Sequence, residues 1–440
     1  MRIIEGFEKA KPLLTREVTH FGLAVSPERP SKKELPTEEV VKRILVDVRD
    51  KGDRALFSYT KKLDRVELSS LEITRSEISD AYKKVDKRLI AALKLAANRI
   101  ERFHSACKQR LVSSFLIHGL GRQVRPLDRV GIYVPGGTAA YPSTVLMTAI
   151  PARVAGVKEI IVVTPPQEDS TIPPAALVAC DIAKVNRIFK IGGAQAIAAL
   201  AFGTESVPKV DKICGPGNVF VVTAKKMVYG TVDIDGLQGP SEIVIVADDT
   251  ATASHCAADL IAQAEHDPQA SAILITTSSK LAEDVQSESK LQLSKLERRN
   301  IARIALKSQG IIVLVDSTDE AIDLVNLYAP EHVLLMVRNP SRYIRKIRNA
   351  GCIFIGDSSP VALGDYIAGP SHVLPTGGSA RFSSPLGIED FLKVTNVIAL
   401  DGAAMKELGQ AAITIAEAEG FKGHAQTIKI RLQPTKERAK

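Results

Sequence analysis

The apolar positions of this chain follow two different periods. Residues 37–50 and 87–103 carry apolar side chains at helical spacing, and residues 405–420 repeat that pattern near the C-terminus. From residue 129 onward, short runs rich in β-branched residues alternate with further helical segments. These runs are 129–134, 159–163, 187–191, 242–247, 272–276, 311–315 and 352–355.

Strands that alternate with helices predict an α/β fold with mostly parallel sheets. The chain has 440 residues, and a single core stops growing at about 250 to 300 residues. The number of strand–helix units therefore predicts two parallel-sheet domains.

Composition narrows the class of protein without naming it. A hydrophobic share of 45% with 25% charged residues is typical of a globular protein. The net charge of +8 is spread along the chain, and Trp is absent, so a small anionic ligand is favoured over nucleic acid. Five cysteines without a CxxC pair predict neither a disulfide framework nor a thiolate zinc site. A charged N-terminus and the lack of a long apolar span predict a cytoplasmic protein without membrane contact.

Three loops that follow predicted strands are rich in glycine: 135–138, 191–196 and 214–218. Such loops let backbone N–H groups approach a phosphate closely at a helix N-terminus. Any one of them is more simply explained as a tight strand-to-helix turn. Three together favour a nucleotide-type ligand, although none contains the G-x-G-x-x-G fingerprint.

Half of the eight histidines lie beside an acid or an amide. Gln263 and His266 are three residues apart, so both side chains project from one face of a helix. The other pairs are Glu331 with His332, Asp365 with His372, and Glu419 with His424. The remaining histidines, His20, His104, His118 and His255, lack such neighbours and are interpreted as structural or surface residues.

These side chains suggest two kinds of chemistry. Gln, His and Asp supply oxygen and nitrogen ligands that suit zinc or another divalent ion, although the spacing alone is equally compatible with polar helix faces. Adjacent Glu331 and His332 would provide two titratable groups able to handle protons and water.

Taken together, the motifs resemble the histidinol dehydrogenase family, from about residue 35 to about residue 431. The segments that carry the resemblance are "GIYVPGGTAAYPSTVLMTAIPARVAGVKEI", "GGAQAIAALAFGTESVPKVDKICGPGN", "GPSEIVIVAD", "QAEHDP", "YAPEHV", "GDYIAGPSHVLPTGGSARFSS" and "AEAEGFKGHA". They are long and scattered along the chain, which makes the resemblance specific. Departures are small: Gln238 stands where a small residue is common, Pro385 replaces the usual glycine, and Val333 replaces leucine.

The resemblance implies an NAD-dependent oxidation of L-histidinol to L-histidine through a bound aldehyde, the final steps of histidine biosynthesis. It implies Glu331 and His332 as the catalytic pair. It also implies one zinc ion per subunit held by Gln263, His266, Asp365 and His424. These four ligands and His332 would contact the substrate together with Ser241, His372 and Glu419. NAD would contact Tyr133, Gln195 and Asn218.

The resemblance further implies two incomplete Rossmann-like parallel-sheet domains with small helical terminal pieces, in a homodimer with shared active sites. The expected division is an N-terminal piece (1–25), a first α/β domain with the zinc and catalytic residues (26–132 and 242–385), a second on the NAD side (133–241), and a C-terminal piece that completes the partner's site (386–440).

Three alternatives come from other classes. A paralogous zinc-binding dehydrogenase of another amino or sulfonated alcohol would differ around His372 and Glu419, which match the family here. A metal-dependent hydrolase would not need three glycine-rich loops. A non-catalytic nucleotide-binding protein would tolerate the loss of Glu331 and His332.

Overall fold

The computed structural model describes residues 1–15, 36–111, 113–136, 140–297 and 299–433, and its packing separates two compact units. The first unit comprises Met1–Gln109 and Leu127–Phe391, and the second comprises Arg110–Pro126 and Leu392–Lys440. His20, the boundary expected at residues 25 and 26, and part of the glycine-rich loop 135–138 lie outside the described residues.

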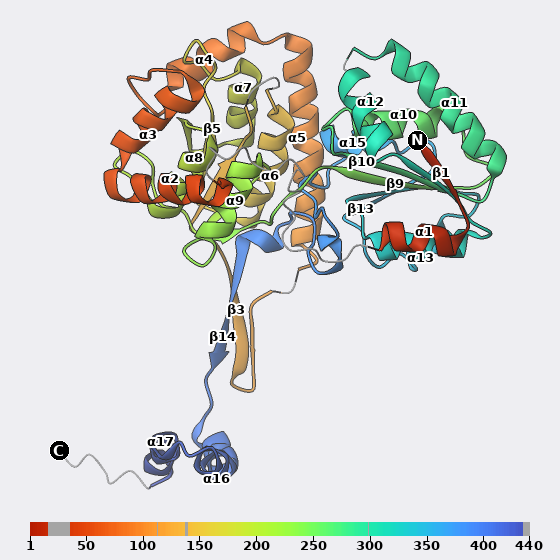
Figure 1. The fold of residues 1–440 in the computed structure, drawn as a ribbon. Coiled ribbons are helices and arrows are strands. Elements are labelled where there is room, and N and C mark those ends of the chain that lie inside the picture. The colour runs from red at the N-terminus through yellow and green to blue at the C-terminus, as the bar shows by residue number, and fades with distance from the viewer. Residues whose placement is uncertain (16–35, 112, 137–139, 298, 434–440) are drawn as a thin grey trace. The chain divides into compact units, whose positions relative to one another are not determined.

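The first unit contains two parallel sheets (Figure 1). The five-stranded sheet has the order β6-β5-β4-β7-β8. Its strands are β4 (Arg129–Tyr133), β5 (Glu159–Thr164), β6 (Arg187–Lys190), β7 (Lys212–Cys214) and β8 (Asp233–Ile234). The six-stranded sheet has the order β1-β11-β10-β9-β12-β13. Its strands are β1 (Arg2–Glu5), β9 (Glu242–Ala247), β10 (Ser271–Thr276), β11 (Ile311–Leu314), β12 (His332–Met336) and β13 (Cys352–Ile355).

The two sheets share one strand order once β1, which adds to the outer edge of the six-stranded sheet beside β11, is left aside. In each, the first three of the remaining strands in sequence run outward to one side, and the fourth and fifth are added on the other side of the first strand. This is the parallel 3-2-1-4-5 arrangement of a Rossmann sheet without its sixth strand. The predicted fold of two incomplete Rossmann-like domains is confirmed.

Helices connect the strands and cover both faces of each sheet. Around the five-stranded sheet they are α6 (Pro142–Ala155), α7 (Pro174–Ala183), α8 (Gly193–Phe202) and α9 (Val219–Val228). Around the six-stranded sheet they are α10 (Ala253–Ala264), α11 (Ser279–Lys295), α12 (Arg299–Ser308), α13 (Thr318–Tyr328) and α14 (Ser341–Ile344). Alternate residues of β9 face opposite layers: Ile243 and Ile245 pack with α10–α12, whereas Val244 and Val246 pack with α13 and α1 (Phe7–Leu14). Strands buried on both faces explain the continuous apolar runs of the sequence.

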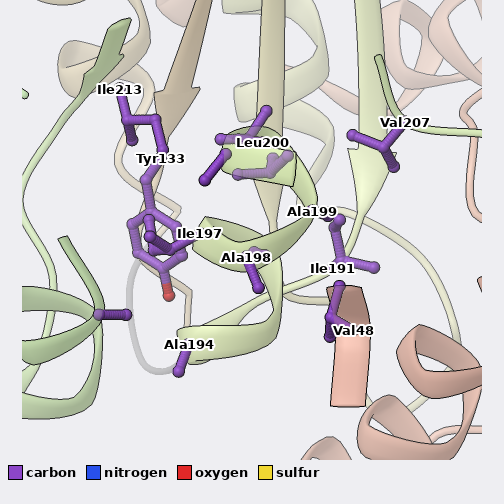
Figure 2. Packing of buried hydrophobic residues seen from close by; sticks show 14 of the residues in the cluster. Val48, Tyr133, Ile191, Ala194, Ile197, Ala198, Ala199, Leu200, Val207 and Ile213 are labelled. Carbon is purple, nitrogen blue, oxygen red and sulfur yellow. The ribbon is translucent and has the colours of Figure 1, made fainter. Parts of the chain in front are cut away.

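The N-terminal helices pack against the helices that cover the five-stranded sheet. They are α2 (Thr37–Lys51), α3 (Asp53–Tyr59), the π-helix η1 (Thr60–Asp64), α4 (Arg75–Lys84) and α5 (Lys87–Lys108). Figure 2 shows Val48 of α2 in one cluster with Tyr133 of β4 and with the apolar side chains of α8. Because half of the residues of α8 are alanine, α2 can approach this buried helix closely.

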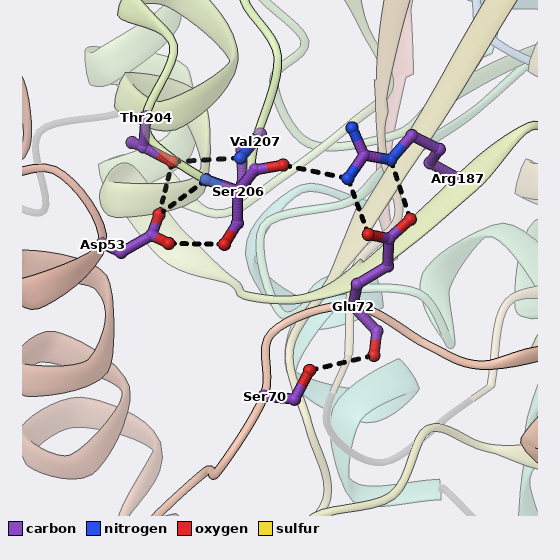
Figure 3. Close-up of polar contacts among 7 residues, drawn as sticks. All are labelled: Asp53, Ser70, Glu72, Arg187, Thr204, Ser206 and Val207. Atoms are coloured by element: carbon purple, nitrogen blue, oxygen red, sulfur yellow. Dashed lines mark hydrogen bonds and ion pairs between the residues drawn. The ribbon is translucent and has the colours of Figure 1, made fainter.

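Polar contacts also join the N-terminal segment to the domain of the five-stranded sheet (Figure 3). Arg187 of β6 donates two hydrogen bonds to Glu72, at 2.7 and 2.6 Å. Asp53 at the start of α3 accepts from the hydroxyls of Thr204 at 2.6 Å and Ser206 at 2.5 Å. This packing differs from the expected division, which grouped residues 26–132 with 242–385. An amphipathic stripe predicts that a helix covers a sheet but does not specify which sheet.

The terminal pieces are less purely helical than expected. β1 pairs in parallel with β11 at the edge of the six-stranded sheet, and β14 (Leu392–Ile398) opens the C-terminal piece as a strand. The first unit also contains α15 (Val361–Tyr366) and the short 3-10 helices η2 (Ser379–Arg381) and η3 (Glu389–Phe391).

The second unit has a very small core. β14 pairs with β3 (Leu120–Pro126), and β3 pairs with β2 (Phe115–Ile117), all antiparallel. The helices α16 (Gly402–Ala418) and α17 (Lys422–Leu432) bury only a small cluster around Ile413, Ala416 and Ala425. Large apolar side chains remain on the surface of this unit, among them Leu116, Ile117, Val394, Ile398, Ile415, Phe421 and Ile430.

None of the helices within the described ranges is long and apolar enough to cross a membrane.

Candidate active site

Glu331 and His332 lie at the amino end of β12, and only 6% and 4% of their surfaces are exposed. The tight turn before them has Ala329 in the left-handed region at φ 53°, followed by Pro330. Gly351 N–H donates to Pro330 O at 3.0 Å, and Cys352 N–H donates to Glu331 O at 2.8 Å. These bonds, together with the pairing of His332 with Cys352 and Ile243, hold both residues at the amino ends of the strands.

The Glu331 carboxylate is surrounded by donors and by negative charge. Its Oε2 accepts from the backbone N–H of Glu242 at 2.9 Å, and its carboxyl also bonds to the Ser241 side chain. Burial raises the pKa of Glu331 well above its ordinary value, and the neighbouring carboxyls of Glu242 and Asp365 raise it further. A carboxylate with a raised pKa is a stronger base than an exposed one.

The His332 ring has one defined tautomer. Nδ1–H donates to the Glu242 carbonyl oxygen at 2.9 Å, and a carbonyl only accepts, so Nδ1 carries the proton. Nε2 is then the basic nitrogen, 3.8 Å from Asp365 Oδ1. Burial lowers the pKa of His332 to about 4, which leaves the imidazole neutral at physiological pH. Nδ1 also lies 3.5 Å from Glu331 Oε2.

A cavity of about 330 Å³ opens beside this pair. Its lining includes His332, Asp365 and His372, and a more apolar part with Phe354 and Leu363. His372 Nδ1–H donates to the Asp365 carbonyl oxygen at 2.7 Å, so its Nε2 is also unprotonated when the ring is neutral. The volume suits a small molecule, and its walls combine apolar surface with a few polar groups.

The first unit brings three of the four expected metal ligands into one region. Gln263 near the end of α10 is buried, His266 lies in the turn after that helix, and Asp365 belongs to α15, which packs on α10. His266 is near enough to His332 and His372 to lower the pKa of both rings. Among the described residues, no group of three or more His, Cys, Asp or Glu side chains is already arranged to hold a metal ion.

Two observations nevertheless fit a cation at these ligands. The Gln263 side-chain nitrogen is buried and has no hydrogen-bond partner within the described part of the chain. The nitrogen and oxygen of a side-chain amide are nearly equal in size, so a flip of the Gln263 amide would place its oxygen at this position, where it could face a cation. Burial raises the pKa of Asp365 to about 6. A bound cation would be a positively charged partner for this carboxylate and would lower that pKa again.

The expected dinucleotide residues lie at the carboxyl ends of the five-stranded sheet. Tyr133 ends β4; its hydroxyl accepts from Gly193 N–H at 3.1 Å, and burial raises its pKa to about 12. Gln195 is buried in the first turn of α8, and its Oε1 has no hydrogen-bond partner among the described residues. Asn218 caps α9 by accepting from the N–H groups of Phe220 and Val221.

Glu331 and His332 lie at the opposite kind of edge. Ligands of open α/β sheets usually bind outside the carboxyl ends of the strands, and the sequence was interpreted with that rule. Glu242 and His332 instead begin β9 and β12, the neighbouring strands at which the order of the six-stranded sheet reverses. The residues expected to contact NAD lie where that rule predicts, whereas Glu331 and His332 lie at the amino ends of their strands.

Glu419 and His424 belong to the second unit. Glu419 follows α16, and His424 lies in the first turn of α17, where its ring stacks on Phe421 with centroids 5.1 Å apart. Both side chains are exposed.

Glu242 also belongs to this site, although it was not among the residues predicted from the sequence. Its backbone N–H and C=O hold Glu331 and His332, and its own Oε1 accepts from Gly377 N–H at 3.1 Å. One signal was available: an acidic residue opens an otherwise apolar strand buried on both faces, where an unpaired charge is costly.

The fold and this site together define an α/β enzyme with glycine-rich loops at one sheet edge and a buried glutamate–histidine pair beside a small cavity. A family model described as histidinol dehydrogenase matches residues 27–432. A relative of that name from Dehalococcoides mccartyi (strain CBDB1) is 51% identical over 436 residues, covering 98% of this chain and 100% of its own. Another from Clostridium acetobutylicum is 51% identical over 411 residues, covering 92% and 95%.

A solved structure described as histidinol dehydrogenase from Elizabethkingia anophelis matches with a TM-score of 0.90 and 36% identity, covering 98% of each chain. The chain belongs to the histidinol dehydrogenase family and is an NAD-dependent oxidoreductase.

Proposed function

We propose that the enzyme oxidises L-histidinol to L-histidine at one site, through a bound aldehyde. One histidinol, one water and two NAD⁺ would yield one histidine carboxylate, two NADH and three protons. The observation that carries this proposal is the tautomer of His332, whose neutral Nε2 borders a cavity of substrate size. A paralogous amino-alcohol dehydrogenase is the less favoured alternative, because His372 and Glu419 match the family.

His332 acts as the base for the alcohol. Its Nε2 accepts the hydroxyl proton while the carbinol carbon loses hydride to NAD⁺. The resulting imidazolium keeps its Nδ1–H bond to Glu242 O and lies beside the Glu331 carboxylate, 3.5 Å away, which stabilises the positive charge.

Glu331 acts on the aldehyde. Its carboxylate takes a proton from water as the water oxygen adds to the aldehyde carbon, and it returns that proton to the aldehyde oxygen, giving the hydrate and restoring the carboxylate. His332, once it has released its first proton, accepts a hydroxyl proton of this hydrate during the second hydride transfer. The two adjacent residues therefore have different tasks.

Gln263, His266 and Asp365, with His424 from a second chain, would hold a zinc ion. The fit rests on the buried Gln263 amide without a partner and on the raised pKa of the Asp365 carboxyl. When bound, zinc would orient the imidazole and amino nitrogens of histidinol. Ser241, His372 and Glu419 would contact the substrate, and Tyr133, Gln195 and Asn218 would contact NAD.

The second unit supports a homodimer in which each chain completes its partner's site. Its core is too small for independent stability, and it exposes many large apolar side chains, which are typical of a surface covered by another chain. Glu419 and His424 are exposed on this unit and available to a partner. The buried thiols of Cys180, Cys214 and Cys256 are typical of a reducing compartment, so we place the enzyme in the cytoplasm.

The division of labour between Glu331 and His332 can be separated kinetically. His332→Asn removes the base and should slow oxidation of both histidinol and added histidinal by about a hundredfold or more. Glu331→Gln keeps the acceptor for Glu242 N–H but cannot take a proton from water. Histidinal from solution arrives largely hydrated, so this variant should oxidise added histidinal much better than it converts histidinol to histidine.

Rates on the two substrates, each relative to the native enzyme, are the measurement. His255→Asn, at an exposed histidine of α10, is the matched control and should behave as native. Equal losses on both substrates in both variants would show that the tasks are not divided in this way.

Zinc content should follow the proposed ligands. Elemental analysis of native protein should find about one zinc per chain, and chelation should abolish activity that added zinc restores. His266→Ala and Asp365→Asn should lose the metal, whereas Asp357→Asn, at a more exposed carboxyl, should keep it. Full activity in metal-free protein would refute the assignment.

Shared sites predict complementation between inactive variants. A hybrid of His332→Ala and His424→Ala chains has both defects in one site and an intact second site. Half of randomly exchanged dimers are hybrids, so mixing should restore about a quarter of native activity.

A mixture of His332→Ala with Glu331→Ala is the control, because each site of that hybrid keeps one defect. If verified subunit exchange restores nothing in the first mixture, each site is built from a single chain.

A further inference from the structure

Lys225 is a lysine without solvent exposure, in the middle of α9. Its ammonium donates to three acceptors: Asp235 Oδ1 at 2.5 Å, Gly215 O at 3.0 Å and Gln238 Oε1 at 3.0 Å. An ammonium has three N–H donors, and a desolvated charge is costly unless it is paired and all its donors are used. All three are used here, which makes this a complete buried network rather than an incidental ion pair.

The network holds the glycine-rich loop 214–218 at its first turn. Asp235 Oδ2 accepts from Gly215 N–H at 2.7 Å, so both backbone polar groups of Gly215 are bound, one by Asp235 and one by Lys225. Gly215 has a φ of 109°, and a Cβ at this position would lie 2.1 Å from the Tyr133 carbonyl oxygen. The loop is therefore fixed against the end of β4, three residues before Asn218.

The same network also holds the first residue of the segment that leads to the catalytic pair. Segment 235–242 runs from Asp235, which follows β8 of the five-stranded sheet, to Glu242, the first residue of β9 in the six-stranded sheet. Gly239 N–H donates to Thr376 Oγ1 at 2.6 Å, which holds the middle of the segment. Its far end places Ser241 and Glu242 on Glu331 and His332.

We infer that Lys225, Asp235 and Gln238 are positioning residues that hold the dinucleotide loop 214–218 in register with the Glu331–His332 pair. This inference rests on the proposed function for its placement of NAD and of the base. One end of segment 235–242 is bound to the loop and the other to the catalytic carboxylate and imidazole. A shift of either end moves the nicotinamide relative to the base, and hydride transfer is sensitive to such displacements.

Gln238 is the residue of the network at which this chain departs from the usual small side chain. A small side chain at this position could not reach the ammonium, whereas the glutamine amide supplies the third acceptor. Its contact also joins the middle of segment 235–242 directly to α9. Gln238 therefore offers a mild way to loosen the register without leaving a charge unpaired.

The test compares Gln238→Met, which keeps the length of the side chain but removes the acceptor, with Gln238→Glu, which retains an acceptor. Gln238→Met should raise KM for NAD and the Kd for NADH, measured by fluorescence titration, by about three- to tenfold. This is less than the loss of a hydrogen bond to a charged group would cost directly, because the effect reaches NAD only through the position of the loop. KM for histidinol should stay within about twofold, because the proposed metal ligands and all of the proposed substrate contacts except Ser241 lie outside segment 235–242. Gln238→Glu should restore most of the NAD affinity.

Lys225→Met should show the same selectivity with a larger effect, and Lys226→Met, at the neighbouring lysine that pairs with Glu38, is its control. If Lys225→Met does not fold, the Gln238 variants decide. Native NAD kinetics in folded Gln238→Met, or equal changes in KM for NAD and histidinol, would overturn the inference. NADH titration needs no turnover, so it tests this inference even if histidinol proves not to be the substrate.

Discussion

The backbone of Glu242 is the point on which the site depends. Its N–H binds the Glu331 carboxylate and its C=O fixes the His332 tautomer, so the backbone of one residue orients both side chains. β9 and β12 are adjacent and parallel, with His332 paired to Ile243, and this register brings Glu242 next to Glu331 and His332. Burial then separates the two pKa values, raising that of Glu331 and lowering that of His332.

The repeated fold explains how two unlike sheet edges come together. The five-stranded sheet presents its carboxyl edge, with Tyr133 and Asn218, and the six-stranded sheet presents its amino edge, with Glu242 and His332. Segment 235–242 joins these two edges directly. In the proposed function, this short connection allows one sheet to bind the dinucleotide while the other holds the base.

Much of this could be predicted from the sequence, because the signals were local. Short apolar runs identified β4, β5, β6, β9, β10, β11 and β13, but not β12 or the short strands β1, β7 and β8. The adjacency of Glu331 and His332, with Gln263 and His266 on one helix face, pointed to the candidate site. The placement of α2–α5 beside the five-stranded sheet could not be predicted, since a helix stripe does not specify its partner sheet. Glu242 was missed because it holds Glu331 and His332 through its backbone, and the only signal in its residue type is an acid at the start of an apolar strand. β14 pairs with β3 across about 270 residues, a contact that no local pattern encodes.

The stoichiometry of NADH formation tests the central claim most directly. Purified enzyme with a limiting amount of L-histidinol and excess NAD should form two NADH for each histidine, with no free histidinal accumulating. One NADH per histidinol with release of the aldehyde would contradict the claim that Glu331 and His332 complete both oxidations at one site. Absence of histidinol-dependent NADH formation would contradict the proposed substrate itself.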